Sequence, residues 1–176
     1  MRTTQQDPAA QWEAFQRLAQ PGEAHKRLEP MVGTFRAQTR FWMSPQMPPQ
    51  ESQGTMNTRW VLGGRFLLSE YKDSAPGSPF EGIGLIGFDN PKQRYVGMWT
   101  DSMGTMLMPI SEGTADARGK VTTMHRTFDD PMSGQPKPMR EVITIASRDE
   151  HTYESYVPGP DGKEYKALDV RYTRAN

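Results

Sequence analysis

The sequence contains no cysteine, which excludes disulfides, thiolate nucleophiles and cysteine metal sites together. It also lacks an excess of either charge, because 21 lysines and arginines balance 21 aspartates and glutamates. A chain without a field of one sign has little to attract DNA, RNA or an anionic membrane. We therefore expect neither nucleic acid nor membrane as a partner.

Long hydrophobic runs are missing as well. No stretch reaches the roughly 18 apolar residues of a membrane span, and residues 1–15 hold no apolar segment of signal-peptide length. Together with the lack of cysteine, this predicts a soluble cytoplasmic protein.

The mean hydropathy is low, at −0.78. However, 12 methionines, 7 phenylalanines, 6 tyrosines and 4 tryptophans supply enough apolar surface for a folded domain. Methionine is flexible and polarizable, so it suits either gap-filling in a core or an adaptable apolar surface. Both interpretations stay open.

The N-terminal part predicts two short helices. Trp12, Phe15 and Leu18 recur at helical spacing within residues 7–19, and a second short helical pattern covers residues 23–31. Because a stripe of large apolar side chains needs a cover, we expect both helices to pack against the rest of the chain. We assign residues 1–32 to this N-terminal helical cap.

After residue 32 the pattern alternates with a period of two, which is typical of strands. Short strands joined by short loops pair with their neighbours in antiparallel fashion, and closure into a barrel removes exposed edges. Residues 33–176 therefore predict an all-β domain, an antiparallel up-and-down β-barrel of about 8–10 strands capped at one end by the helices. The expected strands are 34–43, 52–62, 65–72, 80–89, 94–102, 105–116, 120–130, 140–147, 151–157 and 163–174.

Four acidic residues share the strand parity of apolar neighbours: Glu70, Asp101, Glu141 and Glu154. A buried carboxylate needs a partner or water, because unpaired burial costs several kcal/mol. Either these acids line a partly hydrated cavity that holds a small ligand, or they lie on outer faces beside basic neighbours. Possible countercharges on other strands are Arg59, Arg140 and Arg171.

The stretch 95–109 places Trp99 and Asp101 on one face of a strand and then continues in Met103, Met106 and Met108. In one interpretation, Trp99 plugs the barrel and Asp101 accepts hydrogen bonds in a turn. In the other, Trp99 forms a cavity wall, Asp101 is its polar anchor, and methionines are an adaptable lining. The expected ligand-binding residues are Trp99, Asp101, Met103, Glu70, Glu141, His125, Tyr156 and Arg171.

His25, His125 and His151 are far apart in the sequence and do not have the spacing of a metal site, so we predict none. No cofactor motif is present, and the cofactor stays unassigned. The glycine-rich stretch 80–89 opens no helix, so its glycines indicate strand coiling or close approach of a neighbour. An enzyme would need Asp101, Glu70 and His125 to converge on one pocket.

Several motifs in order along residues 22–174 resemble the bacterial domain-of-unknown-function 1579 family: "GEAHKRLEPMVGTF", "RWVLGGRFLLSEY", "PFEGIGLIGFDNPKQRYVGMWTDSMGT", "PMREV" and "GPDGKEYK". The resemblance implies a calycin-like barrel, distantly similar to lipocalins, fatty-acid-binding proteins and the haem-binding nitrobindins. It implies no established activity. A small-molecule ligand and a homodimer both stay open as partners.

The similarity to nitrobindins adds a haem or diatomic-gas binder as a third possible function. Their opening Gly-x-Trp-x-Gly signature corresponds here to Gly33, Phe35 and Ala37. The last strand carries no histidine for haem, and His151 lies one strand earlier. The Arg-x-Tyr pair of fatty-acid-binding proteins is also absent, because Arg171 is directly followed by tyrosine.

Overall fold

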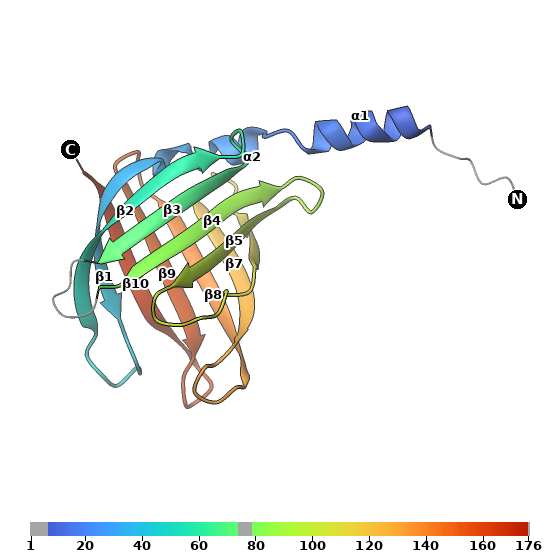
Figure 1. Ribbon diagram of the computed structural model, residues 1–176. Helices are drawn as coiled ribbons and strands as arrows, with labels where there is room; N and C mark the ends of the chain where they lie inside the picture. Colours follow the sequence, from blue (N-terminus) through green and yellow to red (C-terminus); the bar gives the residue numbers. More distant parts are fainter. Residues whose placement is uncertain (1–6, 74–78, 176) are drawn as a thin grey trace, which may run out of the picture.

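The computed structural model describes residues 7–73 and 79–175 of the chain. Ten strands form the body of the molecule, preceded by three short helical segments (Figure 1). The helical segments are α1 (Pro8–Leu18), α2 (Glu23–Lys26) and the 3₁₀ helix η1 (Glu29–Met31). The strands are β1 (Gly33–Phe41), β2 (Gln50–Val61), β3 (Phe66–Asp73), β4 (Glu81–Asp89), β5 (Arg94–Asp101), β6 (Ser111–Ala115), β7 (Val121–Asp129), β8 (Pro136–Ile145), β9 (Glu150–Pro158) and β10 (Glu164–Arg174).

The strands close into one antiparallel up-and-down barrel, which confirms the expected fold. Each strand pairs with its neighbours in sequence, and β1 closes the ring by pairing with both β2 and β10. The pairing of β1 with β10 aligns Phe35 with Arg174 and Ala37 with Tyr172. Closure leaves no unpaired sheet edge along these two strands.

One part of the barrel wall is not made of strand. The expected strand 105–116 is wrong in its first half, because β6 begins only at Ser111. The β5–β6 ladder therefore has three pairs, ending at Gly97 with Ser111. Below it, residues 102–110 bridge the lower halves of β5 and β7, held by a Met108 amide that donates to the Trp99 carbonyl at 3.0 Å. Pro109 has no N–H to donate to a ladder.

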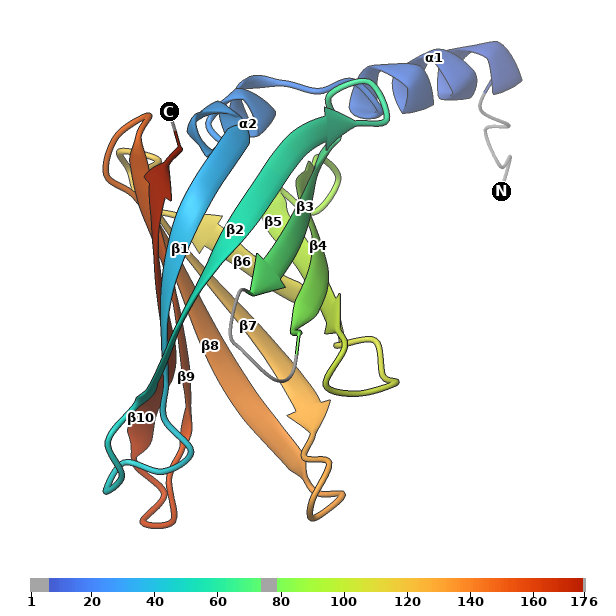
Figure 2. The same cartoon turned by 60° about the vertical axis from the view of Figure 1, so that its left-hand side comes forward.

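The helical segments differ in their contact with the barrel. Helix α2 and η1 cover one end of the barrel, here called the capped end (Figure 2). Leu28 and Met31 are buried there in a core cluster with Leu67, Ile86, Tyr95, Met124 and Ile143. The indole of Trp60 on β2 donates to Glu29 of η1 at 2.6 Å, which ties the cap to the wall.

Helix α1 projects away from the barrel, so the expectation that its stripe packs on the cap is wrong (Figure 1). Trp12 and Phe15 stack on each other but remain 59% and 60% exposed. The Asn90 side chain in the β4–β5 turn holds the end of this segment by donating to the carbonyls of Leu18 and Gln20. A stable short helix needs tertiary burial, and α1 has little of it. No helix in the described part of the chain is long and apolar enough to cross a membrane.

Candidate functional site

Trp99 and Asp101 share one face of β5, as their parity predicted, and the structure shows that this face is the inner one, in line with the buried Tyr95 of the same strand. The Trp99 indole donates to Asp101 Oδ2 at 2.8 Å. The other oxygen, Oδ1, accepts the backbone N–H of Met103 at 3.0 Å, where β5 turns into the segment 102–110. Asp101 therefore fixes both the turn and the orientation of the tryptophan ring.

Glycines opposite the large aromatic rings determine where these rings lie. A Cβ at Gly82 would overlap the six-membered ring of Trp99, and a Cβ at Gly84 would approach it to 3.0 Å. On β2, a Cβ at Gly54 would lie 2.6 Å from the Tyr71 hydroxyl. The Trp99 and Tyr71 rings thus lie along the inner wall over glycine, which is the close approach that the glycine-rich stretch indicated. This arrangement favours Trp99 as a wall of the lumen.

Glu141 is the other predicted site residue that faces inward, and it is 1% exposed. Its carboxylate accepts two hydrogen bonds from Arg126 on β7, Nε to Oε2 at 3.0 Å and Nη2 to Oε1 at 2.5 Å. The Tyr153 hydroxyl on β9 also donates to Oε1 at 2.6 Å. Burial and the nearby carboxylate raise the pKa of Tyr153 well above its usual range, so its proton stays in place.

The same arginine reaches the wall segment between β5 and β7. Arg126 Nη1 donates to the Pro109 carbonyl at 3.1 Å, and Nη2 donates to the Ser111 hydroxyl at 3.3 Å. The bidentate geometry suits a guanidinium and a carboxylate in a low-dielectric interior. Arg126, Tyr153 and Ser111 were not predicted as site residues, although Arg126 shares the parity of the buried Met124.

The expectation that Glu70 and Glu154 face inward is wrong. Glu70 lies on the outer face of β3 beside Arg59, at 3.9 Å. Glu154 lies on the outer face of β9 and pairs with Lys166. Strand β3 is apolar on both faces, with Leu67 and Tyr71 inside, so parity with outer apolar residues gave the wrong side for Glu70.

Three further predicted residues also lie outside the lumen. His125 is exposed on β7, between the strand partners Glu112 and Arg140. The Tyr156 ring on β9 lies under the Arg140 guanidinium, 4.0 Å from its centroid. Arg171 is exposed and pairs with Glu150 at 3.0 Å. The proposed enzyme group of Asp101, Glu70 and His125 is therefore not brought together, because only Asp101 faces the interior.

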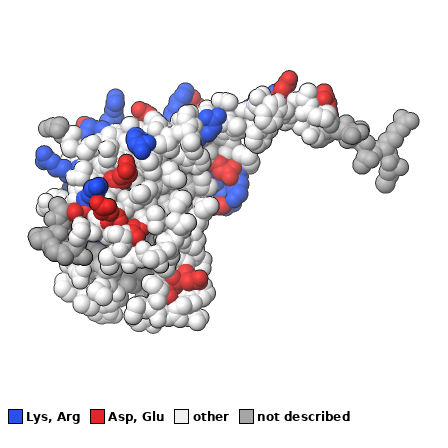
Figure 3. Space-filling model, in the orientation of Figure 1, with Lys and Arg blue, Asp and Glu red and all other residues white. Residues whose placement is uncertain are grey.

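Met103 lies in the turn after β5 and is 80% exposed. This turn lies at the end of the barrel opposite α2, here called the open end. Figure 3 shows charged side chains of both signs on the upper part of one face and fewer near the open end. Eight of the 13 exposed large apolar residues in the described part of the chain lie at the end of β1 or in the β1–β2, β5–β6 and β7–β8 connections on this side of the barrel, and we call these eight the apolar rim: Phe41, Met43, Met47, Met103, Met106, Leu107, Ile110 and Met132.

His151 does not fit a haem ligand in this structure. It is 4% exposed near the capped end, stacked on Tyr172 with ring centroids 4.6 Å apart and edge-on to Phe35 at 4.6 Å. A haem could reach its ring only by displacing both aromatic neighbours. Burial, with a smaller effect of Arg174, lowers the pKa of His151 to about 4. Within residues 7–73 and 79–175, no three His, Asp or Glu side chains are grouped to hold a metal ion.

Two solved structures share this architecture. Rv2717c from M. tuberculosis aligns with a TM-score of 0.66 and 17% identity, covering 89% of this chain and 100% of that chain. The S-type phycobiliprotein lyase CPES from Guillardia theta aligns with a TM-score of 0.61 and 14% identity, covering 89% of this chain and 99% of that chain. At these identities the likeness concerns the fold alone. No functionally curated protein matches the sequence. A family model described as a protein of unknown function (DUF1579) matches residues 20–174, so the chain belongs to this family.

Proposed function

We propose that this protein binds a small, largely apolar molecule in the half of the barrel next to the open end, and that it does so in the cytoplasm. The observation that carries the proposal is the gathering of exposed apolar side chains at the end opposite the helical cap. Apolar patches of this kind mark binding sites, and methionine-rich ones adapt to the shape of what they contact.

The lining of the open half supports a ligand with one polar group. The Trp99 and Tyr71 rings lie over glycines along one wall and pack in the same core cluster, and Asp101 lies beside Trp99. A carboxylate can accept more than the two hydrogen bonds that Asp101 receives from the chain. A ligand with an apolar body and one N–H or O–H donor therefore suits this half of the barrel.

The segment 102–110 offers an entry route, because no β-ladder crosses the wall there. Ser102 still bonds to Glu81 of β4 through backbone and side chain. Residues 103–110 are held by fewer interactions: the Met103 amide to Asp101, the Met108 amide to the Trp99 carbonyl, the Thr100 hydroxyl to the Met106 carbonyl at 3.2 Å, and Arg126 to Pro109. Segments with few backbone hydrogen bonds open at low free-energy cost. We infer that the ligand enters past this methionine-rich segment.

The four tryptophans allow the site to be located, because each lies in a different region: Trp12 on α1, Trp42 beside the rim, Trp60 under the cap and Trp99 in the lumen. We would titrate the protein with N-phenyl-1-naphthylamine, an apolar fluorescent amine, and follow the four indole N–H resonances. The proposal expects the Trp99 resonance to shift and that of Trp12 to stay. If the Trp99 indole resonance does not shift with this probe or with any of a panel of fatty alcohols, a lumen site is refuted.

Asp101→Asn separates an anchor from a turn residue, because it keeps the shape and removes the charge. If Asp101 is an anchor, its substitution should lower the affinity for the amine probe by about tenfold, in addition to the stability lost because the amide keeps only one of the two acceptor oxygens used by Trp99 and Met103. As a turn residue only, it should cost about 1 kcal/mol of stability and leave affinity unchanged. Asp130→Asn is the matched control, because Asp130 also accepts turn amides, from Met132 and Ser133, at the same end of the barrel.

A further inference from the structure

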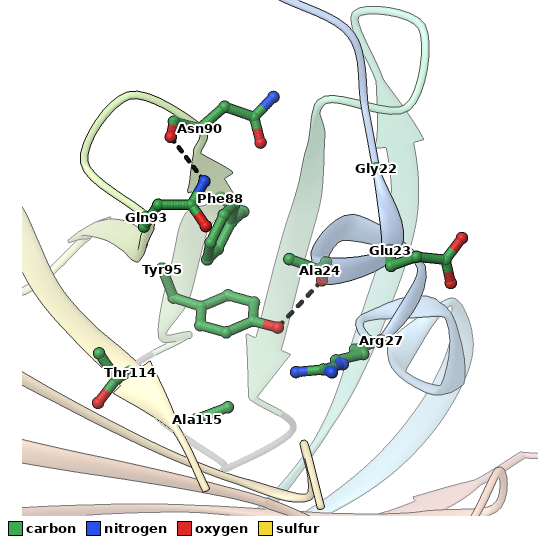
Figure 4. A pocket seen from close by; sticks show the side chains of 10 residues that line it. All are labelled: Gly22, Glu23, Ala24, Arg27, Phe88, Asn90, Gln93, Tyr95, Thr114 and Ala115. Carbon is green, nitrogen blue, oxygen red and sulfur yellow. Dashed lines mark hydrogen bonds between the residues drawn. The ribbon is translucent and has the colours of Figure 1, made fainter. Parts of the chain in front are cut away.

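A pocket lies at the capped end, between α2 and the wall of the barrel. Its volume is about 510 Å³, and it is bounded by α2, the β4–β5 turn and β6 (Figure 4). Phe88 and Tyr95 form one side, and Ala24 and Ala115 add apolar surface. Tyr95 belongs to the buried core cluster of Leu28 and Met31, and Ala24, Phe88 and Ala115 pack against that cluster, so the pocket lies on the outer side of the core under the cap.

Arg27 is the charged group that points into this pocket, toward the Tyr95 hydroxyl (Figure 4). Its stem packs on the β6–β7 turn, where a Cβ at Gly119 would lie 2.8 Å from Arg27 Cδ. The Tyr95 hydroxyl donates to the Ala24 carbonyl at 3.0 Å, so its oxygen can still accept a hydrogen bond. The Arg27 side chain thus packs on the β6–β7 turn and directs its guanidinium toward the Tyr95 hydroxyl (Figure 4).

Arg27 has no acidic partner within salt-bridge distance in the described part of the chain. The acid among the lining residues, Glu23, pairs with Lys26 at 2.6 Å. Glu23 points away from Tyr95 in Figure 4. The pocket therefore combines apolar walls with a guanidinium that forms no salt bridge within the described residues.

We propose that the capped-end pocket binds a small molecule with an aromatic or aliphatic body and one carboxylate, which pairs with Arg27. A guanidinium matches a carboxylate through two parallel hydrogen bonds, and its fixed planar geometry makes that match specific. The body of the ligand lies against Phe88 and Tyr95, in the way that binding pockets combine apolar walls with a few polar groups. This proposal does not depend on the lumen site.

The test is an NMR titration with 2-naphthoate, compared with the neutral 2-naphthamide. We expect naphthoate to shift the Arg27 Nε–H and the backbone amides of Thr114 and Ala115, and to bind about tenfold more tightly than the amide. Arg27→Gln should weaken naphthoate binding by about tenfold or more, and Arg27→Lys by less, since it keeps the charge and loses the bidentate geometry. Arg36→Gln, an exposed arginine on the outer face of β1, should leave binding unchanged.

Three results would overturn the proposal: no shift at these residues, equal binding of acid and amide, or full affinity in a folded Arg27→Gln protein. A naphthoate titration that shifts only the Trp99 indole would place the acid in the lumen and would also overturn it. If the amine probe does not shift the Trp99 resonance, only the lumen site is refuted. The two proposals are therefore tested independently.

Discussion

Glu141 is a carboxylate 1% exposed within a barrel, and it depends on its ion pair with Arg126. Removing one partner of a buried pair leaves the other charge uncompensated, which costs about 3–5 kcal/mol. Replacing both partners by apolar residues of similar size removes that charge and is often neutral or stabilising. The Arg126–Glu141 pair thus specifies how β7 and β8 pack inside the barrel, even where its net contribution to stability is small.

We therefore expect Glu141→Gln to lower the free energy of unfolding by about 3–5 kcal/mol and Arg126→Met with Glu141→Leu to restore most of it. Urea unfolding of the single and double variants measures both. Glu70→Gln is the matched control, because its pair with Arg59 at 3.9 Å is about half exposed on both sides, and such pairs contribute roughly 0–1 kcal/mol. A double variant as unstable as the single one would contradict this account.

His151 should make the protein sensitive to acid. A histidine in the unfolded chain binds its proton near pH 6.5, whereas the buried ring binds it only near pH 4. Above pH 6.5 the ring is neutral in both states, so it adds no pH dependence to the free energy of unfolding. Between pH 6.5 and 4 the unfolded state gains the proton first, so stability falls, by about 3 kcal/mol in total.

The measurement is urea unfolding at neutral pH and near pH 4.5 for the wild type, His151→Phe and His125→Asn. We expect the pH-dependent loss to shrink in His151→Phe, which cannot titrate, and to persist in His125→Asn, because His125 is exposed. Equal losses in all three proteins would mean that other groups account for the acid sensitivity.

At the scale of the elements, the strands could be predicted well because alternation is a strong signal of a half-buried sheet. The predicted strand 105–116 was longer than β6, because residues 105–110 are apolar enough to resemble a strand. They include Pro109, however, and lie outside the sheet. The inner face was harder to assign: β3 is apolar on both faces, and β9 directs His151 and Ser155 inward. Arg126 was missed because an alternating charge usually marks the outer face.

The glycines of β4 belong to the same scale, because they decide the position of a residue on β5. Gly82→Ala would place a methyl group 2.1 Å from Cζ2 of the Trp99 ring, so the ring has to shift. We expect a loss of about 1–3 kcal/mol and a shifted Trp99 indole resonance. Gly104→Ala has no atom within 4 Å of the added Cβ and should leave both unchanged. An unaltered Trp99 resonance in Gly82→Ala would show that the ring does not rest on this glycine.

At the scale of the molecule, the helical segment has two parts with different relations to the barrel. Helix α1 is exposed along its apolar stripe, whereas Leu28 and Met31 are 2% and 8% exposed within the core. Removal of residues 1–16 keeps the Leu18 and Gln20 carbonyls that Asn90 binds. The free energy of unfolding should therefore depend on α2 and η1 and not on α1.

We expect a chain that lacks residues 1–16 to unfold at a temperature close to that of the full chain. A chain that lacks residues 1–31 loses the burial of Leu28 and Met31, at roughly 1.5–3 kcal/mol each, together with the bond from Trp60 to Glu29. It should be destabilised by several kcal/mol, which differential scanning calorimetry of the three chains would measure. A strong loss on removal of residues 1–16 alone would mean that the stripe of Trp12, Phe15 and Leu18 is buried in solution. In that case α1 would be part of the cap after all.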